Sequence, residues 1–185
     1  LHQLDRGEEI ATRFAGQPMA SALQQWLAGG ECPETSAAGR LFDAAAALLG
    51  LCDIATYEGE APMLLESAVR SPRALPGGYT LDNGVVSFAP LLRALADCAD
   101  PVAGADWFHG TLADAIAAWV AWAVDRTGLA TVVLAGGCLV NARLAGGVLA
   151  GLDGRGLQLL LPREMPPGDG AVSLGQAWVA RHSAD

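Results

Sequence analysis

The chain has 185 residues, of which 52% are hydrophobic and 17% are charged, a balance typical of one or two compact globular domains and not of a disordered segment. Its formal net charge is −9, from 11 basic and 20 acidic residues. Because so acidic a chain has no basic surface to displace counterions from phosphates, we expect no nucleic-acid partner.

The first thirty residues predict a helical segment. Apolar side chains recur at helical spacing over residues 5–27, and Gly29 and Gly30 follow as a stop signal. We expect this helix to break near Pro18. Residues 1–30 are therefore treated as an N-terminal helical segment, and residues 31–185 as the main lobe.

The next apolar run, residues 37–51, is rich in alanine and predicts a second helix. Thr35 or Ser36 is the expected cap at its start. Gly50 is the expected end, because glycine commonly follows the last turn of a helix.

The middle of the chain predicts a hairpin among helices. Asn83 and Gly84 stand between two β-favouring runs, which is the strongest short-range signal for a hairpin. Pro101 and Gly104 mark the expected junction between a helix that ends near residue 99 and a helix that begins near residue 105. Helical spacing predicts helices over residues 63–69, 90–99 and 105–124.

From residue 129 onward the pattern changes to strand, glycine turn, helix, strand, loop and final helix. This alternation predicts a β-α-β-α unit with a parallel pair of strands. The fold class expected from the sequence is therefore α/β.

The cysteines and the N-terminus bear on the cellular compartment. The four cysteines are far apart and form no C-x-x-C pair, so we expect no zinc site made of closely spaced thiols, but small buried residues of a cytosolic protein. No signal-peptide pattern and no apolar run of membrane-spanning length occur, so we expect a cytoplasmic protein without membrane contact. The cysteines are Cys32, Cys52, Cys98 and Cys138.

Two predicted strand ends carry residues that could bind a ligand, since ligands of parallel α/β sheets lie beyond the carboxyl ends of the strands. After the first strand, Gly136 and Gly137 allow close backbone approach, and Asn141 falls on the first turn of the next helix. A plain turn with a surface or capping asparagine is the alternative. After the second strand, Asp169 precedes Gly170 and is either a metal or phosphate-metal ligand or an N-cap.

Three further polar positions are ambiguous. Asp43 lies in an otherwise apolar stretch and is either a surface charge or a carboxylate directed at a site. Glu58 and Glu60 flank a glycine in a loop, where solvation alone explains them. His109 lies beside two aromatic residues, which favours a structural role over catalysis. The chain has no G-x-S-x-G, G-x-G-x-x-G or P-loop motif, which argues against serine hydrolases, ordinary dehydrogenases and P-loop proteins.

Five segments together resemble the C-terminal part of HypF, the carbamoyltransferase family of NiFe-hydrogenase maturation. The resemblance covers about residues 31–180 and implies one ribonuclease-H-like lobe of the actin-like ATPase and sugar-kinase fold, with additional helices. This fold, shared with the TsaD family, holds ATP between two lobes. In chain order, the segments are TSAAGRLFDAAAALLGL, TYEGEAPMLLE, WFHGTLA, VVLAGGCLVNARL and PPGDGAVSLGQA.

The resemblance also implies an activity. Carbamoyl phosphate and ATP would give carbamoyl adenylate, and the carbamoyl group would pass to the C-terminal cysteine of a HypE-like acceptor protein. It assigns Asp169 to a divalent metal, which could be iron, zinc or magnesium. It assigns nucleotide contacts to Asp43, Gly59, Glu60, Gly136, Gly137 and Asn141.

The chain departs from the family pattern in three places. The family's H-x-x-x-H pair is absent, so we expect the other metal ligands to lie outside this chain and the chain alone to lack the full active site. The family's Asp-Gly-Gly reads Asp169-Gly170-Ala171, and Ala135 stands where serine is usual. Two alternatives therefore remain beside a nucleotide-binding lobe. One is a non-catalytic module that docks on a partner or forms a homodimer, and the other is an O-carbamoyltransferase.

Overall fold

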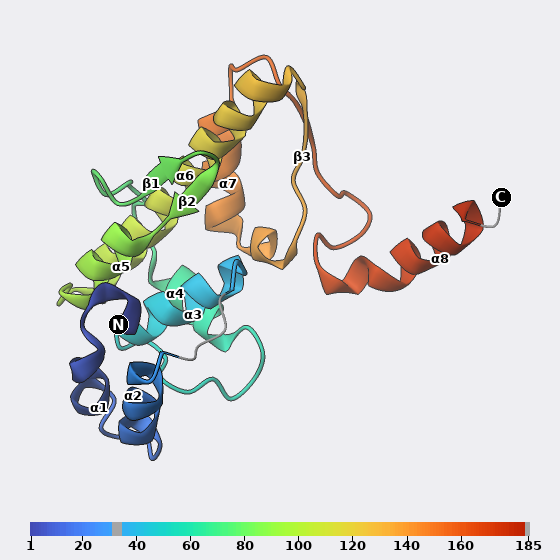
Figure 1. Ribbon diagram of the computed structural model, residues 1–185. Coiled ribbons are helices and arrows are strands. Elements are labelled where there is room, and N and C mark those ends of the chain that lie inside the picture. Colours follow the sequence, from blue (N-terminus) through green and yellow to red (C-terminus); the bar gives the residue numbers. More distant parts are fainter. Residues whose placement is uncertain (31–34, 184–185) are drawn as a thin grey trace.

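The computed structural model describes residues 1–30 and 35–183 (Figure 1), so Cys32 lies outside the described residues. The helices are α1 (Ile10–Arg13), α2 (Ala20–Ala28), α3 (Ala38–Leu48), α4 (Glu60–Ala68), α5 (Ala89–Ala96), α6 (Pro101–Thr127), α7 (Ala142–Leu152) and α8 (Val172–His182). The strands are β1 (Thr80–Asp82), β2 (Val85–Ser87), β3 (Thr131–Val133) and β4 (Gln158–Leu160). Short 3-10 turns are η1 (His2–Leu4), η2 (Gly7–Glu9), η3 (Gly137–Val140) and η4 (Asp169–Ala171).

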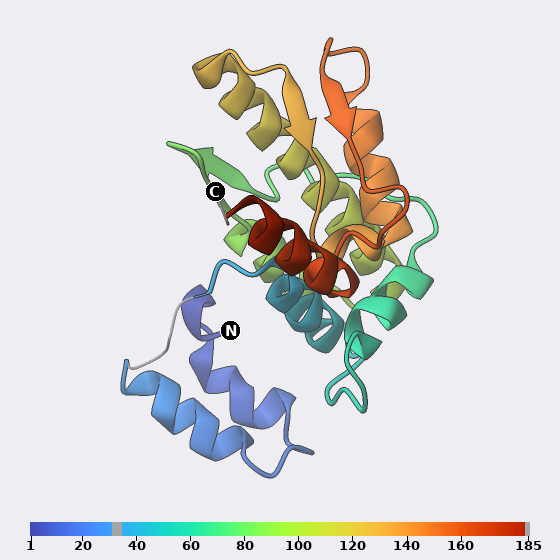
Figure 2. The ribbon, with the colours of Figure 1, turned by 90° about the vertical axis from the view of Figure 1, so that its right-hand side faces the viewer.

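β3 and β4 form a parallel pair connected through α7, which confirms the predicted β-α-β-α order and the α/β class. Val132 pairs with Leu159, and both pack on the hydrophobic core. The next pair, Val133 and Leu160, is exposed. Because successive side chains of a strand alternate between faces, one face of the pair covers the core and the other is bare. Figure 2 shows the strands side by side, with α6 and α7 behind them.

α6 is the central helix. Asp100 caps it with its side chain, Pro101 occupies the first turn, and Gly128 ends it in the left-handed conformation with φ 69°. The predicted break between two helices is present, but it lies earlier, over residues 97–100, because Pro101 begins α6 and Gly104 lies inside it. A Cβ at Gly104 would overlap the side chain of Leu49, so this glycine allows α6 to pack closely on that residue.

No helix in the described part of the chain is both long and apolar enough to cross a membrane.

α7 packs closely along α6 because small residues meet where the helices cross. A Cβ on Gly147 would lie 2.8 Å from the Cβ of Ala113, and one on Gly151 would lie 2.9 Å from the Cβ of Ala117. Carbon atoms do not normally approach so closely. The two glycines therefore set the distance between the helices.

The core joins α3 to α6 through aromatic rings. Phe42 in α3 packs edge to face on Phe108, with ring centroids 4.8 Å apart, and on His109 at 5.8 Å. All three side chains are fully buried. Because Asp43 follows Phe42 directly, this packing fixes the part of α3 that carries the Asp43 carboxylate.

The N-terminal segment is helical but more broken than predicted. Asp5 has a positive φ of 60°, so a regular helix cannot begin there, and two 3-10 turns precede α1. The expected break near Pro18 is confirmed, because α1 and α2 are separate helices. The Arg13 guanidinium donates to the carbonyls of Leu48 and Ala96 at 3.3 and 2.5 Å, which attaches the segment to α3 and α5.

The two ends of α3 differ in how well they were predicted. The N-cap is Ala37, and neither Thr35 nor Ser36 caps the helix. Thr35 lies two residues before the N-cap, and its hydroxyl accepts from the Ala37 N–H instead. Gly50 ends the helix with φ 66°, as predicted.

The predicted hairpin is confirmed and rests on α6. Asn83 and Gly84 turn between β1 and β2 with φ values of 47° and 83°. The Trp119 indole donates to the Gly84 carbonyl at 2.9 Å, and the Trp122 ring occupies the space that a Cβ at Gly84 would need. Glycine at this turn therefore also brings the hairpin onto the helix.

Candidate functional site

Two glycine loops meet at the carboxyl ends of β3 and β4. The Gly136 N–H donates to the Pro167 carbonyl at 2.6 Å, and a Cβ at Gly168 would lie 2.9 Å from the Cα of Gly137. Gly136 itself has a φ of 112°, which other residues rarely adopt. Asp169 is exposed and follows the second loop directly. The structure thus brings the two predicted strand-end motifs together.

The loop after β3, which contains Gly136 and Gly137, has backbone N–H groups without a hydrogen-bond acceptor in the described part of the chain. Within the described residues, the N–H groups of Gly137 and Cys138 donate to no protein acceptor. Unpaired N–H groups at a tight turn are suited to anionic oxygens. This turn can therefore bind an anion without any basic side chain.

Asp43 lies near the same turn, since α3 packs against η3, and Glu60 lies at the start of α4, which packs against α3. The Asp43 carboxylate is 39% exposed and pairs with Arg40 at 3.0 Å. Burial raises the pKa of the Cys138 thiol, and the Asp43 carboxylate raises it further. Burial likewise raises the pKa of Cys52, with further contributions from carboxylates that include Glu60 and Asp43. The two carboxylates therefore lie within electrostatic reach of a common thiol.

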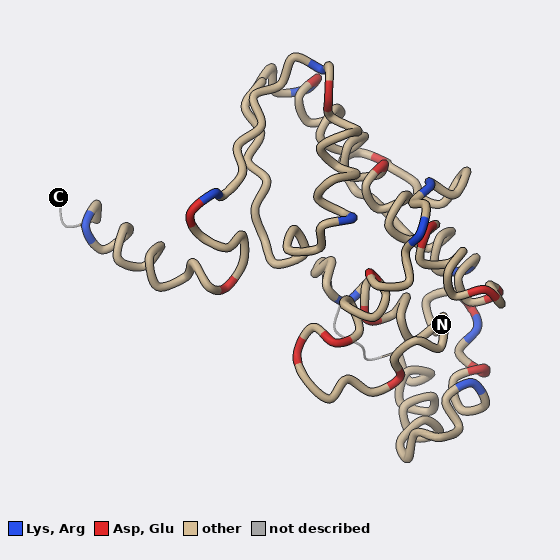
Figure 3. Tube along the Cα trace, turned by 180° about the vertical axis from the view of Figure 1, so that it is seen from behind, with Lys and Arg blue, Asp and Glu red and all other residues tan. Residues whose placement is uncertain are grey.

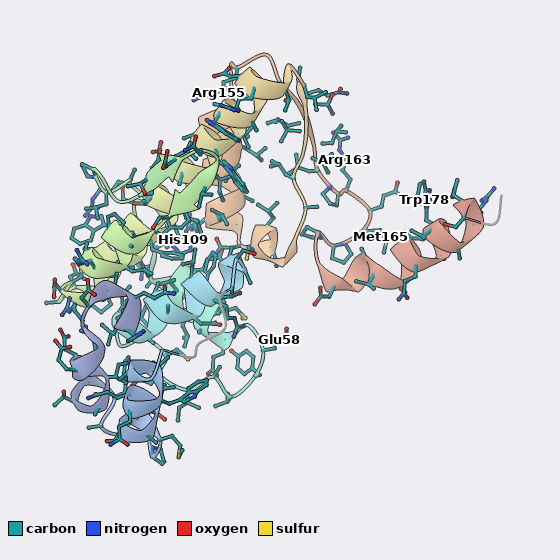
Figure 4. The ribbon with its side chains drawn as sticks, in the orientation of Figure 1. Glu58, His109, Arg155, Arg163, Met165 and Trp178 are labelled. Carbon is teal, nitrogen blue, oxygen red and sulfur yellow. The ribbon has the colours of Figure 1, made fainter. Side chains whose placement is uncertain are left out.

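Glu60 shapes its own loop. Its carboxylate accepts from the Thr56 N–H at 2.5 Å and from the Thr56 hydroxyl at 2.9 Å, and these bonds lower the pKa of Glu60. Gly59, with φ 86°, is the N-cap of α4. Glu58 lies exposed in the same loop (Figure 4). The structure thus gives Gly59 and Glu60 a clear local role and leaves Glu58 to solvent.

Asn141 is buried against His109. It is the N-cap of α7, one residue before the predicted first turn, so the capping alternative is what the structure shows. Asn141 Oδ1 accepts from the Leu144 N–H at 2.8 Å, and Asn141 Nδ2 donates to His109 Nε2 at 3.0 Å. His109 Nδ1 donates to the Ala105 carbonyl at 2.9 Å, which confirms the structural role predicted for this histidine.

The Glu66 carboxylate of α4 caps the N-terminus of α7 together with Asn141. This role of Glu66 was not predicted from the sequence. Its Oε1 accepts from the N–H groups of Ala142 at 2.7 Å and Arg143 at 3.3 Å. With Asn141 bound to Leu144, side chains occupy the first N–H groups of α7. The first N–H groups of α7 are therefore not free to bind an anion, unlike those of Gly137 and Cys138 in η3. The one sequence signal that points to a role for Glu66 is its position as a charged residue in an apolar helical run.

Asp169 has no partners that would complete a metal site in the described residues. The N-cap of η4 is Gly168 and no side chain caps it, so the N-cap alternative for Asp169 is wrong. No group of three His, Cys, Asp or Glu side chains in the described part of the chain could hold a metal ion. Because one carboxylate does not hold a divalent ion tightly, these residues do not fit a complete metal centre.

The glycine loops lie on an open face. Two open hollows occur elsewhere, one of about 400 Å³ beside the end of α7 and one of about 460 Å³ between residues 72–74 and the α6–α7 pair. None of the residues predicted to contact nucleotide lines either hollow. Figure 3 shows acidic residues in the loop before α4 and in the segment leading to α8, which contains the second glycine loop.

Sequence comparison identifies close relatives. A family model described as "Carbamoyltransferase, Kae1-like Domain, second subdomain" matches residues 1–176. The chain is 40% identical to "Carbamoyltransferase HypF2" of Cupriavidus necator, covering 100% of the chain and 27% of that protein. It is 46% identical to "Carbamoyltransferase HypF" of Rhizobium leguminosarum, covering 80% of the chain and 20% of the relative. The chain thus spans about a quarter or less of the length of these two relatives.

Structural comparison agrees. A crystal structure of full-length HypF in the phosphate- and nucleotide-bound form matches with a TM-score of 0.81 at 23% identity, over 100% of this chain and 26% of that one. The structure of T. kodakarensis HypF matches with a TM-score of 0.75 at 23% identity, over 96% and 24%. These matches confirm the predicted fold, a mixed α/β lobe of the actin-like kind with additional helices.

Proposed function

This chain belongs to the HypF carbamoyltransferase family, and we propose that it forms the nucleotide-binding lobe of such an enzyme. The meeting of two glycine loops beside Asp43 supports this most strongly, because the unpaired N–H groups of Gly137 and Cys138 suit phosphate oxygens. One structure with the same fold is HypF in a nucleotide-bound form.

The charges suggest how a nucleotide would lie. The phosphates would bind at Gly136 and Gly137, while the Asp43 carboxylate would accept hydrogen bonds from ribose hydroxyl groups. The Gly59–Glu60 turn would line the same face. Carboxylates repel phosphate, so the sugar and not the phosphates would face Asp43 and Glu60.

The chemistry would belong to the complete protein. Carbamoyl phosphate and ATP would yield carbamoyl adenylate, and the carbamoyl group would pass to the C-terminal cysteine of a HypE-like acceptor. Asp169 would be a single ligand of a divalent metal, with its other ligands outside the described residues. The lobe by itself would therefore bind nucleotide without turning over substrate.

Replacing Asp43 tests the proposed function. We expect Asp43→Ala to weaken ADP and ATP binding about 10- to 100-fold, because each hydrogen bond to a charged group contributes about 1.5–3 kcal/mol. Calorimetric titration of the complete protein measures the affinity, with and without magnesium. Asp153→Ala is the matched control, since Asp153 is exposed at the far end of α7. A wild-type protein that binds no nucleotide at millimolar concentration would rule out the proposal.

α8 favours a second function, self-association. All of its residues are exposed, including Val172, Leu174, Trp178 and Val179 at 53–61%. The helix extends away from the body, with Trp178 along it (Figures 1 and 4). The bare face of β3 and β4 also carries two exposed apolar side chains, Val133 and Leu160, and parallel strands are normally covered on both faces. Two such faces in one chain could cover each other in a dimer.

Sedimentation velocity tests self-association. We expect the wild-type protein to dimerise and Trp178→Ser to shift it to monomer at the same concentration, because the large apolar ring would leave the interface. Ala180→Ser is the control on the opposite side of α8. Monomeric wild-type protein at high micromolar concentration would exclude this function.

A further inference from the structure

A chain of hydrogen bonds fixes the state of His109 in the interior. His109 Nδ1 lies 2.9 Å from the Ala105 carbonyl, and His109 Nε2 lies 3.0 Å from Asn141 Nδ2. A carbonyl can only accept, so Nδ1 carries the proton, and a neutral histidine then has Nε2 as its acceptor. His109 is 1% exposed, so water does not replace either partner. The side chain therefore has one tautomer and one orientation.

The surroundings keep His109 neutral. Burial lowers its pKa most and outweighs the hydrogen bond to the Ala105 carbonyl, which raises it. Among nearby charges, Arg143 lowers the pKa of His109, and Glu66 and Asp106 raise it. Neither carboxylate is a hydrogen-bond partner of the ring, because its two nitrogens are bonded to the Ala105 carbonyl and the Asn141 amide. An uncharged ring leaves Nε2 free to accept from Asn141.

The hydrogen bond that Asn141 donates to His109 decides which group the asparagine amide has left for a ligand. One amide hydrogen of Asn141 goes to His109 and its carbonyl oxygen goes to Leu144, so the second amide hydrogen is left. Aspartate or serine would cap α7 equally well. An ionised aspartate has no hydrogen to donate to Nε2, whereas the asparagine amide has one, so capping alone does not explain this pair.

We propose that His109 is a positioning residue that orients the Asn141 amide, so that Asn141 presents a donor to an acceptor atom of the nucleotide. That acceptor would be a ribose oxygen or a base nitrogen. This inference rests on the proposed nucleotide-binding function and adds a second residue to it. Figure 4 shows His109 within the body of the chain, among the helices that form the core.

Two substitutions of His109 separate orientation from packing. His109→Leu fills the space but removes the acceptor, and we expect about tenfold weaker ADP binding by the complete protein. His109→Gln supplies an acceptor oxygen, and we expect affinity within about threefold of wild type. If His109→Leu binds ADP as wild type does, the positioning role is wrong while nucleotide binding stands. If wild type binds no ADP, both proposals fail.

Asn141→Asp tests the role of the Asn141 donor without replacing a buried side chain by one of a different shape. An aspartate keeps the cap oxygen, and a negative charge at a helix N-terminus is favourable, so we expect thermal stability close to wild type. The donor is lost, so ADP binding should still fall about tenfold. Wild-type affinity in a folded Asn141→Asp protein would overturn the proposal. Nitrogen NMR of the His109 ring checks the tautomer separately, since a protonated Nε2 would also overturn it.

Discussion

Gly110→Ala is expected to lower the free energy of unfolding by about 3 kcal/mol, although alanine is normally the better residue inside a helix. Gly110 lies within α6, and a Cβ there would overlap the backbone of Arg73. Backbone cannot rotate away as a side chain can. The segment around Arg73 would have to move and would lose the bond from the Arg73 N–H to the Asp106 carbonyl, now 3.1 Å long.

Gly146→Ala is the matched control because it makes the same change in α7. No atom lies within 4 Å of a Cβ built at Gly146. There the helix preference of alanine should act alone and stabilise the protein by up to about 1 kcal/mol. Urea unfolding measures both variants. A stabilised Gly110→Ala protein would contradict the close approach of Arg73 to α6.

The elements that were predicted correctly are those with local signals. The Asn83-Gly84 turn, the end of α3 at Gly50 and the β-α-β-α order each depend on residues within a few positions of one another. The start of the N-terminal helix was missed because Asp5 takes a left-handed conformation, which periodicity does not reveal. Gly104 was misread as punctuation because its partner, Leu49, is distant in sequence.

The same distinction applies to the candidate site. The pairing of the Gly136 loop with the Asp169 loop follows from the rule for parallel strands, and the structure brings the two loops together. The nucleotide roles of Asp43 and Glu60 came only from the family resemblance and stay proposals. The link from Glu66 to the start of α7 spans 76 residues and leaves no periodic pattern, so only the structure could supply it.

Asp106→Leu should also be strongly destabilising, with an expected loss of about 3 kcal/mol in the free energy of unfolding. Asp106 is 3% exposed, and its Oδ1 accepts from the N–H groups of Arg70 and Ser71, both at 2.8 Å. Leucine would leave both N–H groups without their acceptor. The segment that follows α4 would then lose two of its hydrogen bonds to α6, one turn before His109.

Asp106→Asn distinguishes these backbone bonds from the charge. Asparagine keeps Oδ1 in place for both N–H groups and loses only the pair between Oδ2 and the Arg73 guanidinium, which are 3.4 Å apart. Because the Arg73 side chain is 54% exposed, that pair contributes less than about 1 kcal/mol. Urea unfolding should therefore rank wild type above Asp106→Asn and Asp106→Leu last. If the asparagine variant is as unstable as the leucine variant, the ion pair and not the backbone bonds holds this segment on α6.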